Sequence, residues 1–214
     1  MKTKFLSALA LLLSLLLVLA GCSGGSTTAT TTVAQTTAAQ TTVAPSIDNA
    51  TAENIPPYTG HAYIALNGNT PTFTAEEIAN ATKSYEYFSE LDVLGRCGYV
   101  EASVGVDLMP TEPRGSIGMV KPSGWQTAKY DIVNGKYLYN RCHLIGFQLT
   151  GENANKQNLI TGTRYLNIDG MLPFENMVAD YVKETGNHVM YRVTPLYAGT
   201  NMLASGVRIE TRKY

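Results

Sequence analysis

Histidine, cysteine and tryptophan are scarce in this sequence: its 214 residues include three His, three Cys and one Trp. Zinc hydrolases need several His, Cys or carboxylate ligands at short spacings, as in the HExxH and paired CxxC motifs. Neither motif occurs here, and the three histidines lie far apart in the sequence. The chain therefore offers no zinc-ligand set of these types.

An excess of charge of either sign is also absent. The 16 Lys and Arg residues nearly balance the 17 Asp and Glu residues, which gives a formal net charge of −1. This balance excludes a uniformly basic protein that coats nucleic acid, but it is compatible with a local basic patch. No internal repeat is present.

The N-terminus carries an apolar run, Phe5–Leu19, which follows two lysines and ends at small residues. This run is too short for a permanent transmembrane helix and is typical of a secretory signal. The tetrapeptide LAGC that ends at Cys22 is similar to a bacterial lipobox, where the signal is cut before a cysteine that becomes lipidated. We therefore predict a signal peptide at 1–21 and attachment to the outer side of the membrane through Cys22. The alternative is an ordinary cleaved signal with an incidental cysteine.

Residues 22–47 are rich in Thr, Ala and Gln and carry no charge. Such a segment cannot bury enough apolar surface to offset its chain entropy, so we predict a disordered tether. Residues 48–214 are of a size suited to one domain with its own core. The remaining cysteines, Cys97 and Cys142, could form a disulfide outside the cytoplasm or stay as buried free thiols.

The predicted elements indicate an α+β fold with a mostly antiparallel sheet flanked by helices. A capping box begins one helix at Thr74, while Pro173 and Gly186 are typical of the start and end of another. The dipeptide Asn134-Gly135 predicts a tight turn between two strands. We predict helices over 74–92 and 172–186, strands over 61–67, 97–108, 129–134, 136–145, 188–197 and 206–213, and a long loop over 110–127.

The predicted helix over 172–186 has one apolar face at i, i+3, i+4, i+7 and i+8. We assign this face to the core, and Glu175 flanks it at the first turn. His61 and His188 lie at the starts of predicted strands, and we expect structural roles for both. The five core residues are Phe174, Met177, Val178, Tyr181 and Val182.

The segment Asn140-Arg-Cys-His143 carries the first candidate chemistry. In a strand, Arg141 and His143 project from one face and Cys142 from the other. An imidazole can deprotonate water near neutral pH, and a guanidinium can bind a phosphate through two donors. Because Cys142 and His143 point apart, they do not form a protease dyad. The alternative for Arg141 and His143 is ordinary packing and surface placement.

Neutral amides follow this segment. The amide oxygens of Asn158 and Asn167 are hard ligands, and one of them together with retained waters is enough to bind Mg²⁺ beside a phosphate. Glu175 could reach a water of that ion. The alternatives are loop or turn roles for the two asparagines, and a favourable charge at a helix N-terminus for Glu175.

These residues together resemble the DNA/RNA non-specific endonucleases, or ββα-metal nucleases. Asn140–His143 is similar to the family's Asp-Arg-Gly-His motif, and the spacings of nine and eight residues from Asn158 to Asn167 and on to Glu175 match as well. The run from His143 to Val182 resembles the streptococcal secreted deoxyribonuclease (streptodornase) branch. The similarity covers roughly 60–214 and is densest over 121–195.

The resemblance implies a Mg²⁺-dependent endonuclease, with Mn²⁺ as a possible substitute ion, that cuts DNA and leaves 5′-phosphates. His143 would be the general base, Asn167 the direct metal ligand, and Glu175 would hold a metal-bound water. Arg141 would bind phosphate, and Asn158 would support the metal or His143. Asn140 and Cys142 depart from the family's Asp and Gly, and activity on RNA is left open.

Contacts to the nucleic-acid backbone are assigned to basic residues near the motif. Contact with the backbone alone predicts little sequence preference. Trp125 could stack on a base, but we favour a place in the core. No protein partner is evident, and the competing class is a surface lipoprotein that binds or adheres without catalysis. The basic residues are Arg114, Lys121, Lys129, Lys136, Lys156 and Arg164.

Overall fold

The computed structural model describes residues 50–214. The predicted signal peptide, the lipidation of Cys22, the tether and the first two residues of the predicted domain lie outside these described residues. No helix within the described part of the chain is long and apolar enough to cross a membrane.

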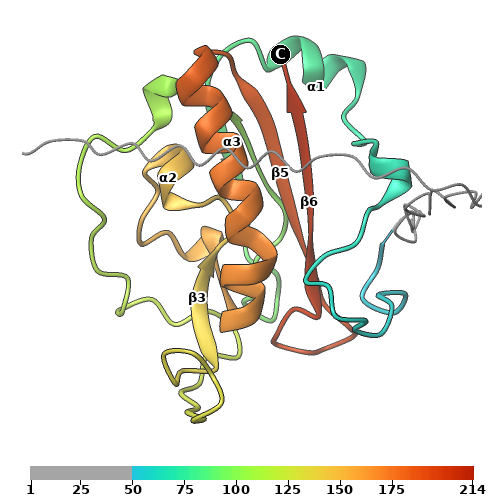
Figure 1. The fold of residues 1–214 in the computed structure, drawn as a ribbon, viewed down its shortest axis with the longest axis vertical. Helices are drawn as coiled ribbons and strands as arrows, with labels where there is room; N and C mark the ends of the chain where they lie inside the picture. Colours follow the sequence, from blue (N-terminus) through green and yellow to red (C-terminus); the bar gives the residue numbers. More distant parts are fainter. Residues whose placement is uncertain (1–49) are drawn as a thin grey trace, which may run out of the picture. The chain divides into compact units, whose positions relative to one another are not determined.

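A four-stranded antiparallel sheet forms one side of the domain (Figure 1). Its strands are β1 (Tyr85–Phe88), β2 (Val100–Val104), β5 (Val189–Leu196) and β6 (Gly206–Lys213), in the order β1-β2-β5-β6. The predicted α+β class with a mostly antiparallel sheet is therefore confirmed.

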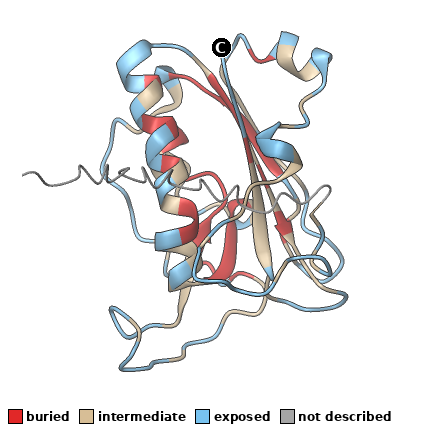
Figure 2. Cartoon of the chain, turned by 45° about the vertical axis from the view of Figure 1, so that its right-hand side comes forward, coloured by how far each residue is buried: buried red, intermediate tan, exposed pale blue. Residues whose placement is uncertain are grey.

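Strand β2 lies inside this sheet, and all five of its residues are buried. Its apolar residues belong to a core shared with the long helix α3 (Leu172–Thr185) and with β5 (Figure 2). Its polar residues face the other way: Glu101 accepts a hydrogen bond of 2.6 Å from Arg192, and Ser103 donates one of 2.6 Å to the carbonyl of Ala81. These partners satisfy the buried polar groups, as a protein interior requires.

A second unit consists of two antiparallel strands followed by α3. Strand β3 (Tyr139–His143) pairs with β4 (Leu159–Thr163), and a π-helical turn, η4 (Leu166–Met171), leads into α3. Helix α3 ends at Gly186, whose φ of 70° suits a residue without a Cβ. The connection between β3 and β4 contains α2 (Phe147–Thr150) and the short helix η3 (Lys156–Asn158).

The first predicted helix is shorter than expected. Its capping box is present at Thr74, but α1 (Ala75–Asn80) ends before Tyr85 and Phe88, which belong to β1. A short run rich in aromatic residues does not separate a helix from a strand by periodicity alone. The prediction that the helix extends to Asp92 is wrong.

Two strand predictions need correction, and one strand was not predicted. Residues 61–67 form no strand and lead into a 3₁₀ turn, η1 (Asn67–Asn69). The strand predicted over 97–108 is limited to β2, and a 3₁₀ turn, η2 (Val106–Leu108), follows it. Strand β4 lies between the strand predicted over 136–145 and the helix predicted over 172–186, where no strand was predicted.

The hairpin predicted at Asn134-Gly135 forms only in part. The chain turns there, but positive φ angles occur at Gly135 and Lys136, so the turn is displaced by one residue. The ladder is limited to one bridge, between Lys129 and Tyr137, and β3 pairs with β4 instead. The long loop over 110–127 is confirmed, because it contains no helix or strand.

The apolar face predicted for α3 is mostly correct. Val178 and Val182 are buried in the core, and Tyr181 packs against it. Met177, however, is 65% exposed, and Phe174 is half-buried against Tyr63 outside the core cluster, so the assignment of these two residues to the core is wrong. Glu175 is the buried member of the first turn, at 7% exposure.

Candidate active site

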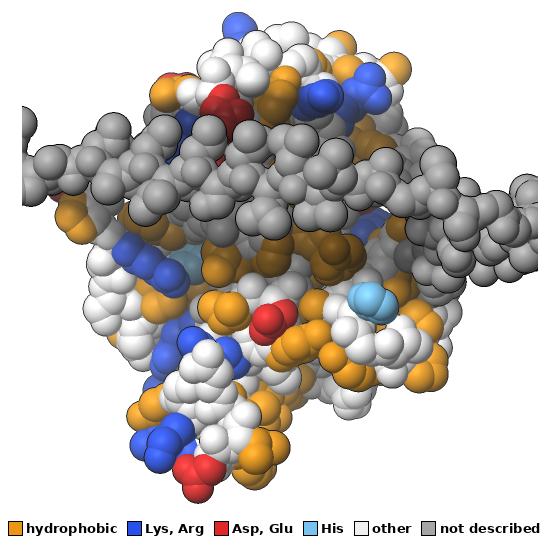
Figure 3. Space-filling model, in the orientation of Figure 1, with side chains coloured by type: hydrophobic (Ala, Val, Ile, Leu, Met, Phe, Trp, Pro, Cys, Tyr) orange, Lys and Arg blue, Asp and Glu red, His pale blue; other side chains and the backbone are white. Residues whose placement is uncertain are grey.

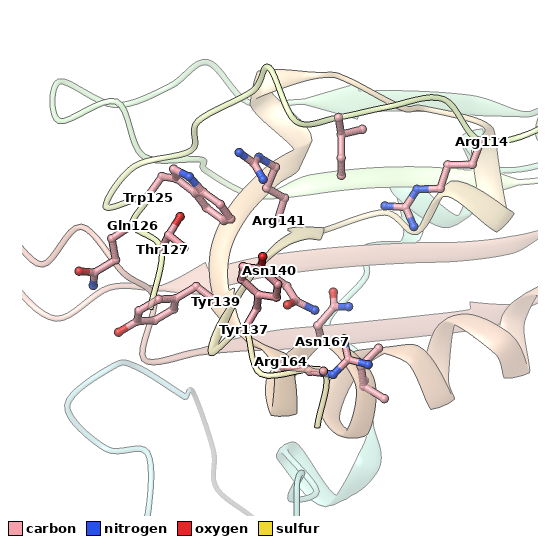
Figure 4. A pocket seen from close by; sticks show the side chains of 13 residues that line it. Arg114, Trp125, Gln126, Thr127, Tyr137, Tyr139, Asn140, Arg141, Arg164 and Asn167 are labelled. Atoms are coloured by element: carbon pink, nitrogen blue, oxygen red, sulfur yellow. The ribbon is translucent and has the colours of Figure 1, made fainter. Parts of the chain in front are cut away.

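A cavity of about 610 Å³ opens beside β3, η4 and the loop before β3. Figure 4 shows Trp125 and Tyr139 at one side and Arg114 at the other. We call Arg114, Asn140 and Asn167 the polar end, and Trp125, Tyr137 and Tyr139 the aromatic end. Arg141 and Arg164 also line the cavity.

His143 ends strand β3 and is buried, with 5% exposure. Its Nε2 lies 2.7 Å from the carbonyl oxygen of Asn153, and its Nδ1 lies 3.1 Å from Nη2 of Arg114. A carbonyl can only accept and a guanidinium can only donate, so these partners assign the proton to Nε2 and the lone pair to Nδ1. The imidazole is thus held in one tautomer, with its basic nitrogen toward a residue of the polar end.

Burial lowers the pKa of His143 from its ordinary 6.5 to about 4. The hydrogen bond to the Asn153 carbonyl opposes this shift, and the positive charge of Arg114 adds to it. The ring is therefore neutral at pH 7 and able to accept a proton, but it is a weak base.

Glu175 is the second buried titratable group near Arg114. Burial raises the pKa of its carboxyl to about 7, against the opposing effects of the Gln148 hydrogen bond and the Arg114 charge. Nε2 of Gln148 donates to Glu175 at 3.0 Å. A Cβ at Gly146, three residues after His143, would lie 2.6 Å from Oε2 of Glu175, so the main chain after β3 passes close to this carboxylate.

The two predicted asparagines have different surroundings. Asn158 is fully buried, and its amide bonds both the N–H of Ile145, at 2.8 Å, and the carbonyl of Ile145, at 3.0 Å. Asn158 therefore fixes the main chain two residues after His143. Asn167 lies in η4 and lines the cavity, and no described residue hydrogen-bonds its side-chain amide. Short π-helical segments of this kind are frequent at functional sites.

Arg141 lines the cavity, but its guanidinium is partly engaged. Nε donates to the carbonyl of Val120, Nη2 donates to that of Gly118 at 3.0 Å, and the group lies 3.7 Å from the ring centroid of Trp125. Arg141 thus fixes the loop before β3. Trp125 is half-buried at the cavity, so its assignment to the core is wrong.

Both cysteines of the domain are free and buried, which rules out a disulfide between them. Burial raises the pKa of Cys97 to about 11 and that of Cys142 to about 12, so both stay as thiols at neutral pH. A Cβ at Gly162 would lie 2.7 Å from Sγ of Cys142. The absence of a side chain at Gly162 therefore makes room for Cys142 where the family motif has glycine.

The predicted basic residues are divided between the cavity and the surface. Arg114 and Arg164 line the cavity. Lys121, Lys129, Lys136 and Lys156 are exposed and do not line it; Lys129 lies 4.6 Å from the ring centroid of Tyr137, and Lys136 pairs with Asp131 at 3.3 Å.

Two groups at the site escaped the sequence analysis. The first is the carbonyl of Asn153, a main-chain atom that no residue pattern identifies. The second is Gln148, which supports Glu175 from α2. Strand alternation could have placed Tyr137 and Tyr139 on the same face as Arg141 and His143.

The other two histidines lie away from the cavity. His61 is exposed, and His188 lies in a separate cluster with Ser84.

The amide of Asn167 at the polar end, together with the carboxylate of Glu175 near Arg114, fits a hydrated hard cation. No group of three His, Cys, Asp or Glu side chains among residues 50–214 could hold a metal. The amide oxygen of Asn167 faces the cavity, and the buried carboxylate of Glu175 has a raised pKa that a nearby cation would lower. One or two oxygen ligands with several retained waters suit Mg²⁺, not a structural zinc ion.

The two strands and the following helix define the ββα-metal nuclease fold, as predicted. The family model for DNA/RNA non-specific endonucleases matches residues 76–214, and the chain belongs to this family. No curated protein matches the chain.

Solved nucleases share the fold. NucA from Streptococcus agalactiae with magnesium bound has 23% identity and a TM-score of 0.55, and the match covers 61% of this chain and 65% of NucA, just under two thirds. The same protein without metal has 23% identity and a TM-score of 0.57, covering 68% and 71%. Sda1 nuclease with bound zinc has 26% identity and a TM-score of 0.52, covering 60% and 68%. These matches support the predicted streptococcal branch.

Proposed function

We propose that this protein is a metal-dependent endonuclease that hydrolyses phosphodiester bonds of DNA without sequence preference. The observation that carries this proposal is the position of Arg114. Its guanidinium contacts His143 at 3.1 Å, its charge acts on Glu175, and its side chain lines the same cavity as Asn167. Arg114 therefore connects the neutral imidazole and the carboxylate to the cavity that Asn167 lines, and membership of the endonuclease family supports their use on nucleic acid.

His143 is the general base of the proposed reaction. Its Nδ1 takes a proton from the attacking water, while the carbonyl of Asn153 holds the Nε2–H and keeps the ring in place. Arg114 donates to the same Nδ1 in the structure. We infer that the guanidinium turns to a phosphate oxygen when substrate binds, since a charge-assisted bond to phosphate is stronger than one to a neutral imidazole. That movement would free the base.

Asn167 would bind a divalent ion directly, and Glu175 would hold the ion through its hydration shell. When bound, the ion would neutralise charge on the scissile phosphate and assist the departure of the 3′ oxygen. Magnesium, with manganese as a substitute, fits the oxygen donors. NucA with magnesium and Sda1 with zinc support a divalent ion at this fold.

The other predicted residues contribute to positioning and to backbone contact. Asn158 holds the main chain after His143, and Arg141 holds the loop that borders the cavity while its remaining N–H groups face the substrate phosphate. Lys121, Lys129 and Arg164 would contact the DNA backbone beyond the cut site.

We further propose that residues 48–214 form the catalytic domain of an exported lipoprotein. The support is the apolar leader and the lipobox-like sequence that ends at Cys22. The domain would then act on DNA outside the cell, held to the membrane through the lipid and the 22–47 tether. RNA as a second substrate belongs to the same proposal, since RNA carries the same phosphodiester group as DNA.

The direct test is the digestion of plasmid DNA by the purified protein with Mg²⁺, with Mn²⁺ and with EDTA, beside the His143→Ala variant. We expect fragments of many lengths from the wild type with either ion, no digestion in EDTA, and almost none by the variant. Fragment ends should carry 5′-phosphate and therefore be substrates for ligase. Retention of DNA without any digestion would favour the binding lipoprotein instead.

A further inference from the structure

The aromatic end of the cavity has no role in the reaction proposed above. Tyr137 and Tyr139 line the cavity beside Arg141, and His143 completes the series along the chain. Residues two apart in an extended chain project from the same face. Two aromatic rings and a guanidinium therefore line the cavity in succession, and the proposed base is buried two residues further along the chain.

The ring of Tyr137 is accessible although it lies in the cavity wall. It is 47% exposed, and the ammonium of Lys129 lies 4.6 Å from its ring centroid. Trp125 differs, because the guanidinium of Arg141 already lies against its ring at 3.7 Å from the centroid. Tyr137 also has a cation near its ring, but nearly half of its surface is exposed and Lys129 is a flexible, exposed side chain, so its ring is the more available to a ligand.

Cations surround these rings. The guanidinium of Arg164 lies 3.4 Å from the position of a Cβ at Gly135, in the turn before Tyr137. On the face shown in Figure 3, Lys and Arg side chains gather with apolar ones in the lower part of the domain, over this turn and β3. Aromatic rings interleaved with cations are typical of surfaces that bind single-stranded nucleic acid, where bases stack and phosphates pair with Lys and Arg.

The dimensions also suit a nucleotide chain. Two residues of a strand span roughly 6.6 Å, which is close to the length of one nucleotide in an extended single strand. A phosphate at the polar end would therefore place the neighbouring base near Tyr139 and Tyr137. In a duplex, that base is paired and stacked inside the helix and cannot reach the rings.

We propose that Tyr137 and Tyr139 form a subsite that stacks an unpaired nucleobase next to the scissile phosphate. This inference rests on the proposed nuclease function and adds its preferred substrate: single-stranded or locally unpaired nucleic acid. Every base has a flat π-face, so the subsite confers little sequence preference. Stacking does not involve the sugar, so the subsite accepts DNA and RNA bases alike.

The test compares cleavage of a short thymidine strand with cleavage of a strand of the same length made of abasic tetrahydrofuran residues. Both strands have the same phosphates, and only the first has bases. Tyr137→Leu removes the ring, and Tyr137→Phe keeps it. Tyr130→Leu is the matched control, because Tyr130 is 53% exposed on the same turn but does not line the cavity. Urea denaturation establishes that each variant is folded.

We expect Tyr137→Leu to lower the ratio of kcat/KM on the thymidine strand to that on the abasic strand by about tenfold, the effect expected for loss of one stacked base. Tyr137→Phe and Tyr130→Leu should keep the wild-type ratio. A uridine strand should lose the same factor as the thymidine strand, and an effect confined to one sugar would overturn the stacking mechanism.

Failure of this inference differs from failure of the proposed function. A wild-type protein that cuts both strands equally well, with a ratio unchanged by Tyr137→Leu, would remain a nuclease and would have no base subsite. Equal losses on both strands in Tyr137→Leu would also overturn the subsite, because the abasic strand offers nothing to stack. A wild type that cuts neither strand nor plasmid would refute the nuclease itself.

Discussion

Two histidines of the domain lie in polar clusters, and the clusters differ in the partners of the imidazole nitrogens. In the first, Nε2 of His188 lies 3.0 Å from Oγ of Ser84, which in turn donates to Asp107 at 2.5 Å. In the second, Nε2 of His143 donates to a main-chain carbonyl, and Nδ1 faces Arg114 at the cavity.

The first cluster is closed by the main chain. A Cβ at Gly105 would lie within 2.5–2.6 Å of the polar atoms of His188, Ser84 and Asp107, so the main chain packs directly against this cluster. His188, Ser84 and Asp107 are the residue types of a hydrolase triad, yet the serine lies between the other two and no catalytic order results. Contact between Nδ1 and an arginine that lines the cavity, and not residue type, distinguishes the second cluster.

Removal of each imidazole in turn should give the largest difference in activity between the two clusters. His143→Ala should lower kcat on DNA by about 10²- to 10⁴-fold, the usual contribution of a general base. His188→Ala should leave kcat per folded molecule unchanged and cost about 1 kcal/mol in stability, since it removes one hydrogen bond. Initial rates and urea denaturation measure the two quantities. A comparable loss of kcat in both variants would remove the distinction.

The two asparagines should also differ, one in its effect on activity and the other in its effect on stability. Asn167→Ala removes the proposed metal ligand and should lower activity by about a hundredfold or more, with little change in stability. Asn158→Ala leaves the N–H and carbonyl of Ile145 buried without their partners, and should cost about 3 kcal/mol. Denaturation midpoints and Mg²⁺-dependent rates check the pair. A stable Asn158→Ala protein would show that the main chain after His143 does not depend on this amide.

The smallest expected effect is a change in how the free energy of unfolding depends on pH, measured without divalent ions. The pKa of His143 is lowered to about 4, so the unfolded chain binds more protons between about pH 4 and 6.5, and this group makes stability rise with pH. The pKa of Glu175 is raised to about 7, so the folded chain binds more protons between about pH 4.5 and 7, and stability falls with pH. The two contributions oppose each other over most of this range.

Single substitutions should reveal these opposing contributions. Relative to wild type, Glu175→Gln should gain stability as the pH rises from 4.5 to 7, and His143→Ala should lose stability as it rises from 4 to 6.5. Each slope should be at most about 1.4 kcal/mol per pH unit. Urea denaturation across this range measures both. Slopes of the same sign in the two variants would contradict the assigned pKa shifts.

The sequence predicted the elements whose signals are local. Helix α3, strands β5 and β6 and the capping box at Thr74 follow from periodicity and from end signals. Strand β4 was missed because its five residues, LITGT, include a glycine and lie between polar segments. Its burial depends on pairing with β3, which is a tertiary contact that no local pattern carries.

The candidate site was predictable only in part. His143, Asn167 and Glu175 followed from the family motif and its spacing, and the structure places two of them, His143 and Glu175, in the electrostatic reach of Arg114. The engagement of Arg141 with the carbonyls of Gly118 and Val120 could not be foreseen, because main-chain acceptors look the same in every sequence. The assignments of Met177 and Trp125 to the core were wrong because the order of residues along the chain does not show how deeply each side chain is buried.

The partner that orients the His143 ring is a peptide oxygen, and every amino acid carries the same one. Substitution at Asn153 therefore cannot delete this contact, whereas a change in loop length between β3 and η3 would displace it. Gly151, with a φ of 70°, turns the chain toward Asn153 as α2 ends. Among descendants of this gene we expect the side chain at 153 to vary more than the number of residues from 143 to 153, which should stay constant.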